Sequence, residues 1–305
     1  MMTTTATNSL TFEKRPRPQL NAFLLILPSI LLSGFVIGYP IFDVLRMSIS
    51  KVNRFGIVQG FAGWGNFAKA FTDPIFLQAT YQTGLWTLAV VGGTILISIP
   101  IALLLNENFH GRIVARTVIL LPWAVSLAMT AVVWRFVVNG DFGMLNHTLS
   151  SLGLMERNFP WLAYQSTAFG IEVFVGILVS MPFTVTILLG GLSAIPDPLY
   201  DAAQMDGATG WQRFTNITMP LLQPFLKIAV VLNVIYVFNS FPIIWIMTGG
   251  GPANGTDILI TYVYKQAFAF GRIGNAAAAS VMMFLLLLVF SIIYLYLARD
   301  RQENV

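Results

Sequence analysis

Cysteine is absent from this chain of 305 residues, and charged residues are scarce. Without cysteine the chain can form no disulfide, no thiolate metal site and no cysteine nucleophile. Only two histidines occur, His110 and His147, and neither belongs to a His-Glu-x-x-His zinc motif. Charged residues make up 10% of the chain, against about 25% in typical soluble proteins. These scarcities exclude an ordinary soluble protein and argue against an enzyme.

What is abundant is apolar surface, because 56% of the residues are hydrophobic and the mean hydropathy is +0.74. A body of this size with so little ionic surface needs lipid as its solvent. The net charge of +4 is not gathered into a run of basic residues, so nucleic acid is a poor candidate partner.

Six apolar stretches are long enough to cross the roughly 30 Å hydrocarbon core of a membrane. Backbone amides in lipid must be satisfied within their own segment, and none of the stretches alternates as a barrel strand would, so each predicts a helix. The first stretch is about twice the length of a signal-peptide core, so we expect it to stay as an anchor. The predicted fold is an all-α bundle with spans at residues 20–49, 78–105, 113–138, 167–192, 222–247 and 275–298.

An even number of spans places both termini on one side of the membrane. The positive-inside rule does not say which side, because the two alternating groups of loops and tails each hold eight Lys and Arg residues.

The loop at residues 193–220, between spans 4 and 5, has more internal structure than a simple connection requires. Asp197 followed by Pro198 predicts a helix N-cap and first turn, for a short helix from about Pro198 to Met205 that ends at Gly207. Trp211, Phe214 and Ile217 recur as an apolar stripe for the membrane surface or the span ends. From these patterns alone, a capped interfacial connection is the simpler interpretation.

The particular residues of this loop favour a functional interpretation over a simple connection. Asp201-Ala-Ala, then Asp206-Gly-Ala, Phe214, Ile217 and Pro220 resemble the cytoplasmic signature loop of binding-protein-dependent ABC importer permeases, with Asp201 in place of the family's Glu and Met219 in place of its Leu. Other segments typical of the sugar subfamily are Leu121-Pro-Trp-Ala124, Asn139-Gly-Asp-Phe-Gly143 and Thr248-Gly-Gly-Gly-Pro252. The last of these is similar to the first of two paired permeases of the maltose type. The resemblance runs from about residue 20 to the end.

The resemblance implies the type I ABC importer permease fold in a bacterial inner membrane, with the 193–220 loop and both termini in the cytoplasm. The implied organisation is a cytoplasmic tail at 1–19, a permease domain at 20–298 and a second tail at 299–305. The loop would dock on a separate ATPase subunit and transmit its closure as a rigid-body motion. The residues assigned to this coupling are Asp201, Ala202, Ala203, Asp206, Gly207 and Gly210.

The chain has no Gly-x4-Gly-Lys-Ser/Thr phosphate loop, so ATP must be hydrolysed elsewhere. We therefore expect no cofactor on this chain, with ATP and Mg²⁺ on the partner. The implied partners are an ATPase dimer, a second homologous permease, an extracytoplasmic sugar-binding protein and membrane lipid.

Sugars are recognised by neutral hydrogen-bonding groups and aromatic rings, which span 5 offers as Asn233, Tyr236 and Ser240 on one helical face. Polar contacts between helices explain such residues equally well. The resemblance to the maltose type favours a sugar cavity. Its predicted lining residues are Asn233, Val237, Asn239 and Ser240 in span 5, with Gly176, Val179, Ser180 and Phe183 in span 4.

Several other residues receive structural predictions. Glu172 is expected to reach the membrane interface, and Trp123, Trp134, Trp161 and Trp245 to form an interfacial belt. The alanines at 276–279 predict close packing against the partner permease.

Three alternatives stay open at this stage. A carrier driven by an ion gradient would need an internal repeat and a buried ionisable site, and neither is clear in the six spans. The chain could also be an assembly subunit without a substrate path. Within the ABC family, the substrate could be a non-sugar such as glycerol phosphate.

Overall fold

The computed structural model describes residues 19–155 and 158–299 and divides the chain at residues 46 and 47 into two units. The predicted tails at 1–19 and 299–305 lie outside the described residues, apart from Gln19 and Arg299.

The first unit is a helix. It consists of α1 (Gln19–Ser33), the π-helical turn η1 (Gly34–Gly38) and most of α2 (Tyr39–Ser48). Residues Leu25–Ser48 form one apolar helix of 24 residues, which agrees with the span predicted at 20–49. Large apolar side chains such as Leu25, Phe35 and Phe42 are exposed. A helix that is apolar on every side is suited to a lipid environment.

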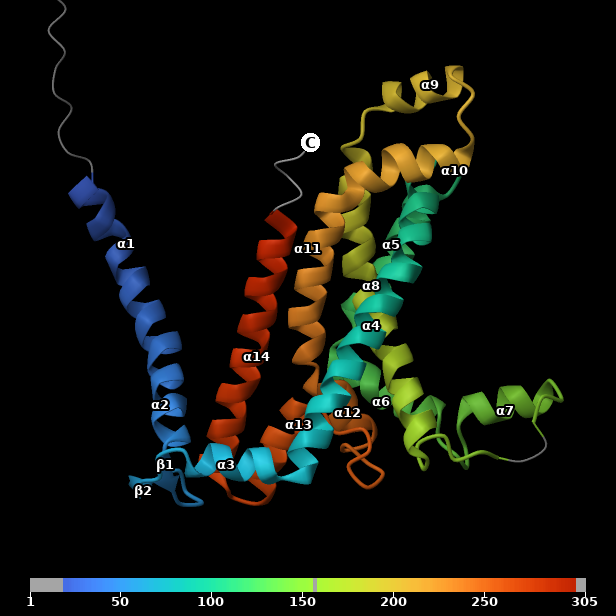
Figure 1. Cartoon of the computed structure of the whole chain (residues 1–305). Coiled ribbons are helices and arrows are strands. Elements are labelled where there is room, and N and C mark those ends of the chain that lie inside the picture. The colour runs from blue at the N-terminus through green and yellow to red at the C-terminus, as the bar shows by residue number, and fades with distance from the viewer. Residues whose placement is uncertain (1–18, 156–157, 300–305) are drawn as a thin grey trace, which may run out of the picture. The chain divides into compact units, whose positions relative to one another are not determined.

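The second unit begins with an antiparallel hairpin of β1 (Ser50–Val52) and β2 (Val58–Phe61), in which Lys51 pairs with Gly60. Among the described residues of this unit, all other regular elements are helical (Figure 1). They are α3 (Gly65–Thr72), α4 (Pro74–Asn106), α5 (Arg112–Ala124), α6 (Leu127–Val137), α7 (Met144–Ser151), α8 (Gln165–Ser193), α9 (Asp197–Met205), α10 (Gly210–Arg213), η2 (Phe214–Thr218), α11 (Met219–Phe238), α12 (Phe241–Met247), α13 (Leu259–Tyr264), η3 (Lys265–Ala269) and α14 (Ile273–Arg299).

Across the described residues, five helices are long and apolar enough to cross a membrane, and α5 with α6 makes a sixth span if this bent pair counts as one. The helix α4, with 33 residues, is about 50 Å long at 1.5 Å per residue. It therefore extends well beyond a hydrocarbon core of about 30 Å. The sequence correctly predicted spans within α4, α8 and α14.

The third predicted span, 113–138, is wrong as a single straight helix. It breaks between α5 and α6, which meet at 92°. Pro122 lies inside the last turn of α5 and has no N–H to donate, and Val125 is extended. Ser126 then caps α6, because its Oγ accepts from the Met129 N–H at 3.2 Å. The break therefore has a cause at each side.

The fifth predicted span, 222–247, is also wrong as one helix. The helix that contains α11 starts at Gly210 and ends at Phe238. Asn239 and Ser240 leave helical geometry, and Pro242 stands in the first turn of α12, where its missing N–H costs nothing. The periodicity had predicted that Ser240 shares a helical face with Asn233. This prediction is wrong, because the helix ends before Ser240.

The core of the second unit lies where α4 packs against α8 and α11. Trp86 of α4 is fully buried, and its Nε1 donates to the Val237 backbone oxygen at 2.9 Å. Gly176 of α8 allows this packing, since a Cβ there would lie 2.9 Å from the Trp86 ring and from Val90. In the same unit, α9 lies at one end of the bundle, and β1, β2 and α3 lie at the opposite end (Figure 1).

Candidate functional site

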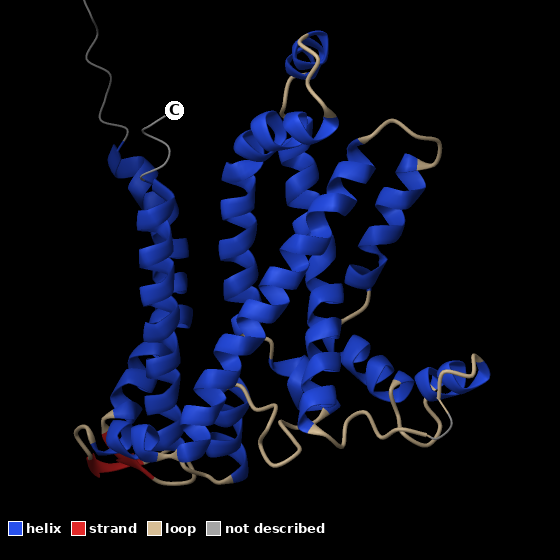
Figure 2. Cartoon of the chain, turned by 45° about the vertical axis from the view of Figure 1, so that its right-hand side comes forward, coloured by secondary structure: helices blue, strands red, loops and turns tan. Residues whose placement is uncertain are grey.

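The first candidate site is the helix α9, which stands away from the bundle on two loop connections (Figure 2). None of its nine residues is buried, and Met205 is 89% exposed. The helix is capped by Pro196, so the prediction of Asp197 as the N-cap is off by one residue. Tyr200 is the residue of α9 that packs against the core of the bundle, so most of the helix surface is left exposed.

The turn after α9 depends on Gly207, which has φ +77°, a conformation that L side chains rarely adopt. Thr209 and Gln212 form a capping box at the start of α10, with the Thr209 N–H donating to Gln212 Oε1 at 2.7 Å. The chain thus leaves α9 and re-enters a helix with a defined geometry. Five of the six predicted coupling residues lie on α9 or in this turn, and Gly210 is the first residue of α10. Asp201, Asp206 and Gly207 are exposed.

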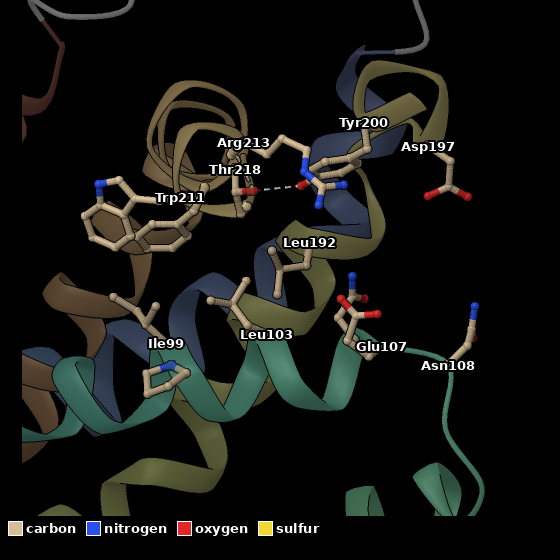
Figure 3. A pocket seen from close by; sticks show the side chains of 14 residues that line it. Ile99, Leu103, Glu107, Asn108, Leu192, Asp197, Tyr200, Trp211, Arg213 and Thr218 are labelled. Carbon is tan, nitrogen blue, oxygen red and sulfur yellow. Dashed lines mark hydrogen bonds between the residues drawn. The ribbon is translucent and has the colours of Figure 1, made fainter. Parts of the chain in front are cut away.

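Beneath this loop lies a cavity of about 710 Å³, bounded by the C-terminal end of α4 and by α9 and α10 (Figure 3). Tyr200 of α9 and Thr218 of η2 share a hydrogen bond of 2.9 Å across it. The Arg213 side chain lies next to Tyr200, and Glu107 faces the cavity from the end of α4. The contact between Tyr200 and Thr218 connects α9 to the helix that continues into α11.

The predicted apolar stripe of the loop divides between two environments. Trp211 is exposed and its ring lies 5.4 Å from that of Phe214, while Ile217 packs against buried residues of α4, α8 and α11. The stripe therefore reaches from the surface to the core.

The second candidate site is a cavity of about 310 Å³ between α5, α8 and α11. Its lining combines aromatic rings with neutral polar groups and contains no charged residue among those described: Trp123, Ser180, Phe183, Leu232, Asn233 and Tyr236. The rings of Trp123 and Phe183 are stacked at 5.4 Å, and Trp123 Nε1 donates to the Val179 backbone oxygen at 3.2 Å. Trp123 therefore lines this cavity from the end of α5, although 52% of the residue is exposed.

Asn233 provides this cavity with a hydrogen-bond acceptor. Its amide nitrogen is already committed, donating to Thr184 Oγ1 and to the Ala229 backbone oxygen, both at 2.8 Å. The amide oxygen Oδ1 is thus the atom left to accept a hydrogen bond from a molecule in the cavity. Thr184 Oγ1 in turn donates to the Ser180 backbone oxygen at 3.1 Å, so a chain of hydrogen bonds fixes the amide's orientation.

Three of the eight predicted cavity residues, Ser180, Phe183 and Asn233, line this cavity. The other five lie elsewhere. Gly176 and Val237 are buried against Trp86, and Val179 is buried with its backbone oxygen bound by Trp123. Asn239 is on the exposed surface, and Ser240 is buried at the break before α12. The prediction assumed one continuous helix and so did not include the break at Asn239 and Ser240. The segment Leu121-Pro-Trp-Ala124 had been singled out as typical of the sugar subfamily, but Trp123 was not predicted to line the cavity.

The predicted exposure of Glu172 is wrong. Its side chain is fully buried in α8, and Thr248 Oγ1 donates to its Oε1 at 2.7 Å. Thr248 Oγ1 also lies 2.8 Å from Thr256 Oγ1, which in turn lies 2.9 Å from the Gly251 backbone oxygen. The carboxylate therefore ties α8 to the Thr248–Pro252 segment that the sequence had singled out.

The alanines at 276–279 are not a surface for another chain. All four are buried within this one, and Ala279 packs with Phe76, Leu259 and Tyr262. Small side chains let α13 and α14 approach each other closely, which explains the run without a partner.

The spans, the neutral cavity and the projecting α9 define a helical membrane protein of the transport class. The family described as "Binding-protein-dependent transport system inner membrane component" matches residues 94–303, and the chain belongs to this family. It is the transmembrane permease subunit of an ABC importer, as the sequence resemblance predicted.

Two relatives and one solved structure agree with this assignment. A probable ABC transporter permease protein of Brucella suis is 53% identical over 92% of this chain and 98% of its own length. The trehalose/maltose transport system permease protein MalF of Thermococcus litoralis is 33% identical over 97% and 99%. A chain from the crystal structure of a bacterial ABC transporter for import of the acidic polysaccharide alginate has the same fold, with a TM-score of 0.81 at 23% identity, covering 92% and 96%.

Proposed function

We propose that this permease forms half of the path for a sugar or sugar derivative and receives its driving force through α9 from a separate ATPase dimer. The observation that carries the coupling part is the exposure of α9, in which no residue is buried and only Tyr200 and Ala203 are partly covered. A second, homologous permease would supply the other half, and an extracytoplasmic binding protein would deliver the solute. In this arrangement α9 and both termini face the cytoplasm.

The route of coupling follows from the contacts of the loop. Closure of an ATPase around α9 would move Tyr200, whose hydroxyl is bonded to Thr218 at the base of α11. The helix from Gly210 to Phe238 is continuous, so a displacement at its base reaches Asn233 in the intramembrane cavity. The chain thus joins an external contact surface to the proposed substrate cavity through one rigid element.

The absence of cysteine makes the docking surface directly testable, because Met205→Cys introduces a unique thiol at an 89% exposed position. In membranes that contain the whole transporter, we expect a thiol-reactive crosslinker to join this residue to the ATPase. Leu154→Cys, which is 70% exposed in the loop after α7, is the matched control and should give no such product. Equal crosslinking at both positions, or none at Met205→Cys, would contradict the assignment of α9 as the docking helix.

The substrate class rests on the neutral cavity and on the trehalose/maltose relative. An aromatic pair beside an amide oxygen suits a sugar ring, which offers an apolar face and hydroxyl donors. A phosphate or carboxylate solute would enter this cavity without a cation to pair with among its lining residues. A carrier driven by an ion gradient is disfavoured because the chain belongs to the ABC importer family.

The cavity assignment is tested by comparing two asparagines of span 5. Asn233→Leu should lower the initial rate of sugar uptake about tenfold, since the cavity loses its hydrogen-bond acceptor while Thr184 keeps its own bond to Ser180. Asn239→Leu alters an exposed residue outside the cavity and should change uptake by less than about twofold.

Uptake is measured in proteoliposomes that contain the complete transporter, with sugars and glycerol phosphate compared as solutes. A larger loss of uptake in Asn239→Leu than in Asn233→Leu would show that the path follows the exposed face of Asn239. Faster uptake of glycerol phosphate than of any sugar would overturn the proposed substrate class.

A further inference from the structure

A pocket of about 510 Å³ has no place in the transport path described above. The elements that form it lie at the end of the second unit opposite α9 (Figure 1). It is formed by the hairpin, by α3 and the start of α4, and by the turn that leads into α14. Lys51 comes from β1, Lys69 from the last turn of α3, and Arg272 from the residue before α14. Three elements distant in sequence thus each contribute a cation to one cavity.

These three cations have no carboxylate partner among the described residues. Asp73 is the one acid among the described residues that line the pocket, and both of its oxygens accept hydrogen bonds. Oδ1 accepts from the Ile75 N–H at 2.9 Å as the N-cap of α4, and Oδ2 accepts from the Tyr262 hydroxyl at 2.8 Å. Burial, and then the bond to Asp73, raise the pKa of Tyr262, so the phenol keeps its proton and goes on donating. The pocket therefore retains a net positive charge.

The backbone adds to this charge. Gly274 and Asn275, in the first turn of the 27-residue helix α14, line the pocket. The first N–H groups of a helix have no partner within it and carry the positive end of the helix dipole. Gly274 is needed for this construction, because a Cβ would lie 2.9 Å from Asn66 Nδ2 and 3.1 Å from the Ser50 backbone oxygen.

The pocket also lies at a defined membrane depth. Two membrane-spanning helices begin at its wall, since Asp73 precedes α4 and Arg272 precedes α14. Large aromatic side chains surround this level with their rings exposed, including Trp64 at 77%, Phe71 at 61% and Phe270 at 59%. Trp is enriched at the interface between acyl chains and headgroups, and the exposed Phe rings beside Trp64 are apolar surface suited to lipid. A group bound here would be at the depth of lipid phosphates.

The geometry points to a binding site for the phosphate headgroup of an anionic phospholipid, held by Lys51, Lys69, Arg272 and the first turn of α14. The phosphate would sit among the cations, and its acyl chains would run along the apolar surfaces of α4 and α14. Such a lipid would join the hairpin and α3 to two spans. It would stabilise this end of the permease without taking part in transport chemistry.

The test uses the full chain in nanodiscs of phosphatidylethanolamine, with or without phosphatidylglycerol. Native mass spectrometry should show phosphatidylglycerol retained on the wild type, and thermal unfolding should move to higher temperature when that lipid is present. The variant Lys51→Gln/Lys69→Gln/Arg272→Gln should lose both effects. The charge-conserving variant Lys51→Arg/Lys69→Arg/Arg272→Lys should keep them.

A single change guards against failure of the triple variant to fold. Arg272→Gln should weaken retention of the lipid about fivefold. The control Arg135→Gln removes a cation at the end of α6, where its guanidinium donates to the Ile246 backbone oxygen at 3.1 Å, and should have no effect on retention. Equal losses in both variants would show a general charge effect and overturn the site.

Two other occupants give different results. Inorganic phosphate alone, added to nanodiscs of phosphatidylethanolamine, should not shift the unfolding temperature. A shift equal to that produced by phosphatidylglycerol would assign the pocket to a small anion and overturn the lipid proposal. The triple variant could instead keep its lipid while the complete transporter that contains it loses the stimulation of ATP hydrolysis by a binding protein. That result would assign the pocket to an acidic protein surface and would also overturn the lipid proposal.

Discussion

Gly207→Asp is expected to reduce uptake about 100-fold, which corresponds to about 3 kcal/mol of lost coupling, while the chain still inserts and folds. Gly207 has φ +77° in the turn between α9 and α10, and a Cβ there would meet no other atom within 4 Å. The substitution therefore strains the turn and adds a charge beside the docking surface without disturbing the core. Its effect should fall on communication between α9 and α11.

The measurement compares ATP hydrolysis with sugar uptake in the same proteoliposomes. Uptake should fall while ATP hydrolysis continues, and the amount of inserted chain should stay at the wild-type level. Gly153→Asp is the matched control, because Gly153 has φ +71°, is exposed and has nothing within 4 Å of a built Cβ. If Gly207→Asp took up sugar at the wild-type rate, or if the two variants lost uptake equally, the turn would have no part in the coupling route.

Lys265→Met is expected to destabilise the permease by about 3–5 kcal/mol, because it leaves a buried carboxylate without its partner. Lys265 Nζ lies 2.6 Å from Asp257 Oδ2 and donates to Asn254 Oδ1 at 3.2 Å. Asp257 is fully buried, and its other oxygen accepts from Thr261 Oγ1 at 2.9 Å. Gly250 packs against both charged groups with no room for a side chain.

The stability deficit of Lys265→Met should depend on pH, and the pKa of Asp257 decides in which direction. Burial raises the pKa of Asp257 even though the bond to Lys265 lowers it, and removing the lysine takes away the lowering cause. In the variant the folded state then holds the Asp257 proton more tightly than the unfolded state does. Stability is retained below the ordinary carboxyl pKa and falls as pH rises through the raised one. The deficit of Lys265→Met should therefore shrink on acidification.

Thermal unfolding in detergent, scanned over pH, measures both effects. Lys265→Met combined with Asp257→Asn removes the unpaired charge and should recover most of the lost stability. Arg46→Met is the contrasting control, because the pair of Arg46 and Asp43 is partly exposed and such pairs contribute about 0–1 kcal/mol. A deficit for Lys265→Met no larger than that of Arg46→Met, or one independent of pH, would contradict the interpretation.

Much of the membrane architecture could be predicted from local sequence. Spans within α4, α8 and α14 were predicted within a few residues because a continuous apolar run in lipid has helix as its only satisfied backbone state. The loop helix α9 was also predicted, with its cap displaced by one residue. Proline, glycine and the small residues at 201–207 act locally, so their effects can be read from the chain alone.

The breaks inside spans 3 and 5 could not be placed in this way. Pro122 and Pro242 stand in apolar runs next to a break, whereas Pro100 and Pro182 lie inside helices that continue through them. Whether a proline ends a helix depends on what satisfies the freed backbone groups nearby. At α6 that role falls to Ser126, and at α12 the proline itself opens the next helix.

Glu172 and Trp123 show the same dependence on contacts between distant segments. Glu172 has the pattern of an interfacial residue, yet it is fully buried because Thr248, 76 residues later, donates to it. Trp123 has the pattern of a belt residue, yet it stacks on Phe183 in the cavity. No local periodicity encodes a partner on another helix.

The sequence by itself determined that this chain lives in lipid, crosses it by helices and carries a structured loop of the ABC permease type, because composition, apolar length and a local motif act within one segment. Only the tertiary structure decided which residues line the cavity, where α5 and α11 end, and which charges remain unpaired at the pocket of Lys51, Lys69 and Arg272. Those properties depend on which side chains meet across helices, and the free energy of each contact belongs to two segments at once.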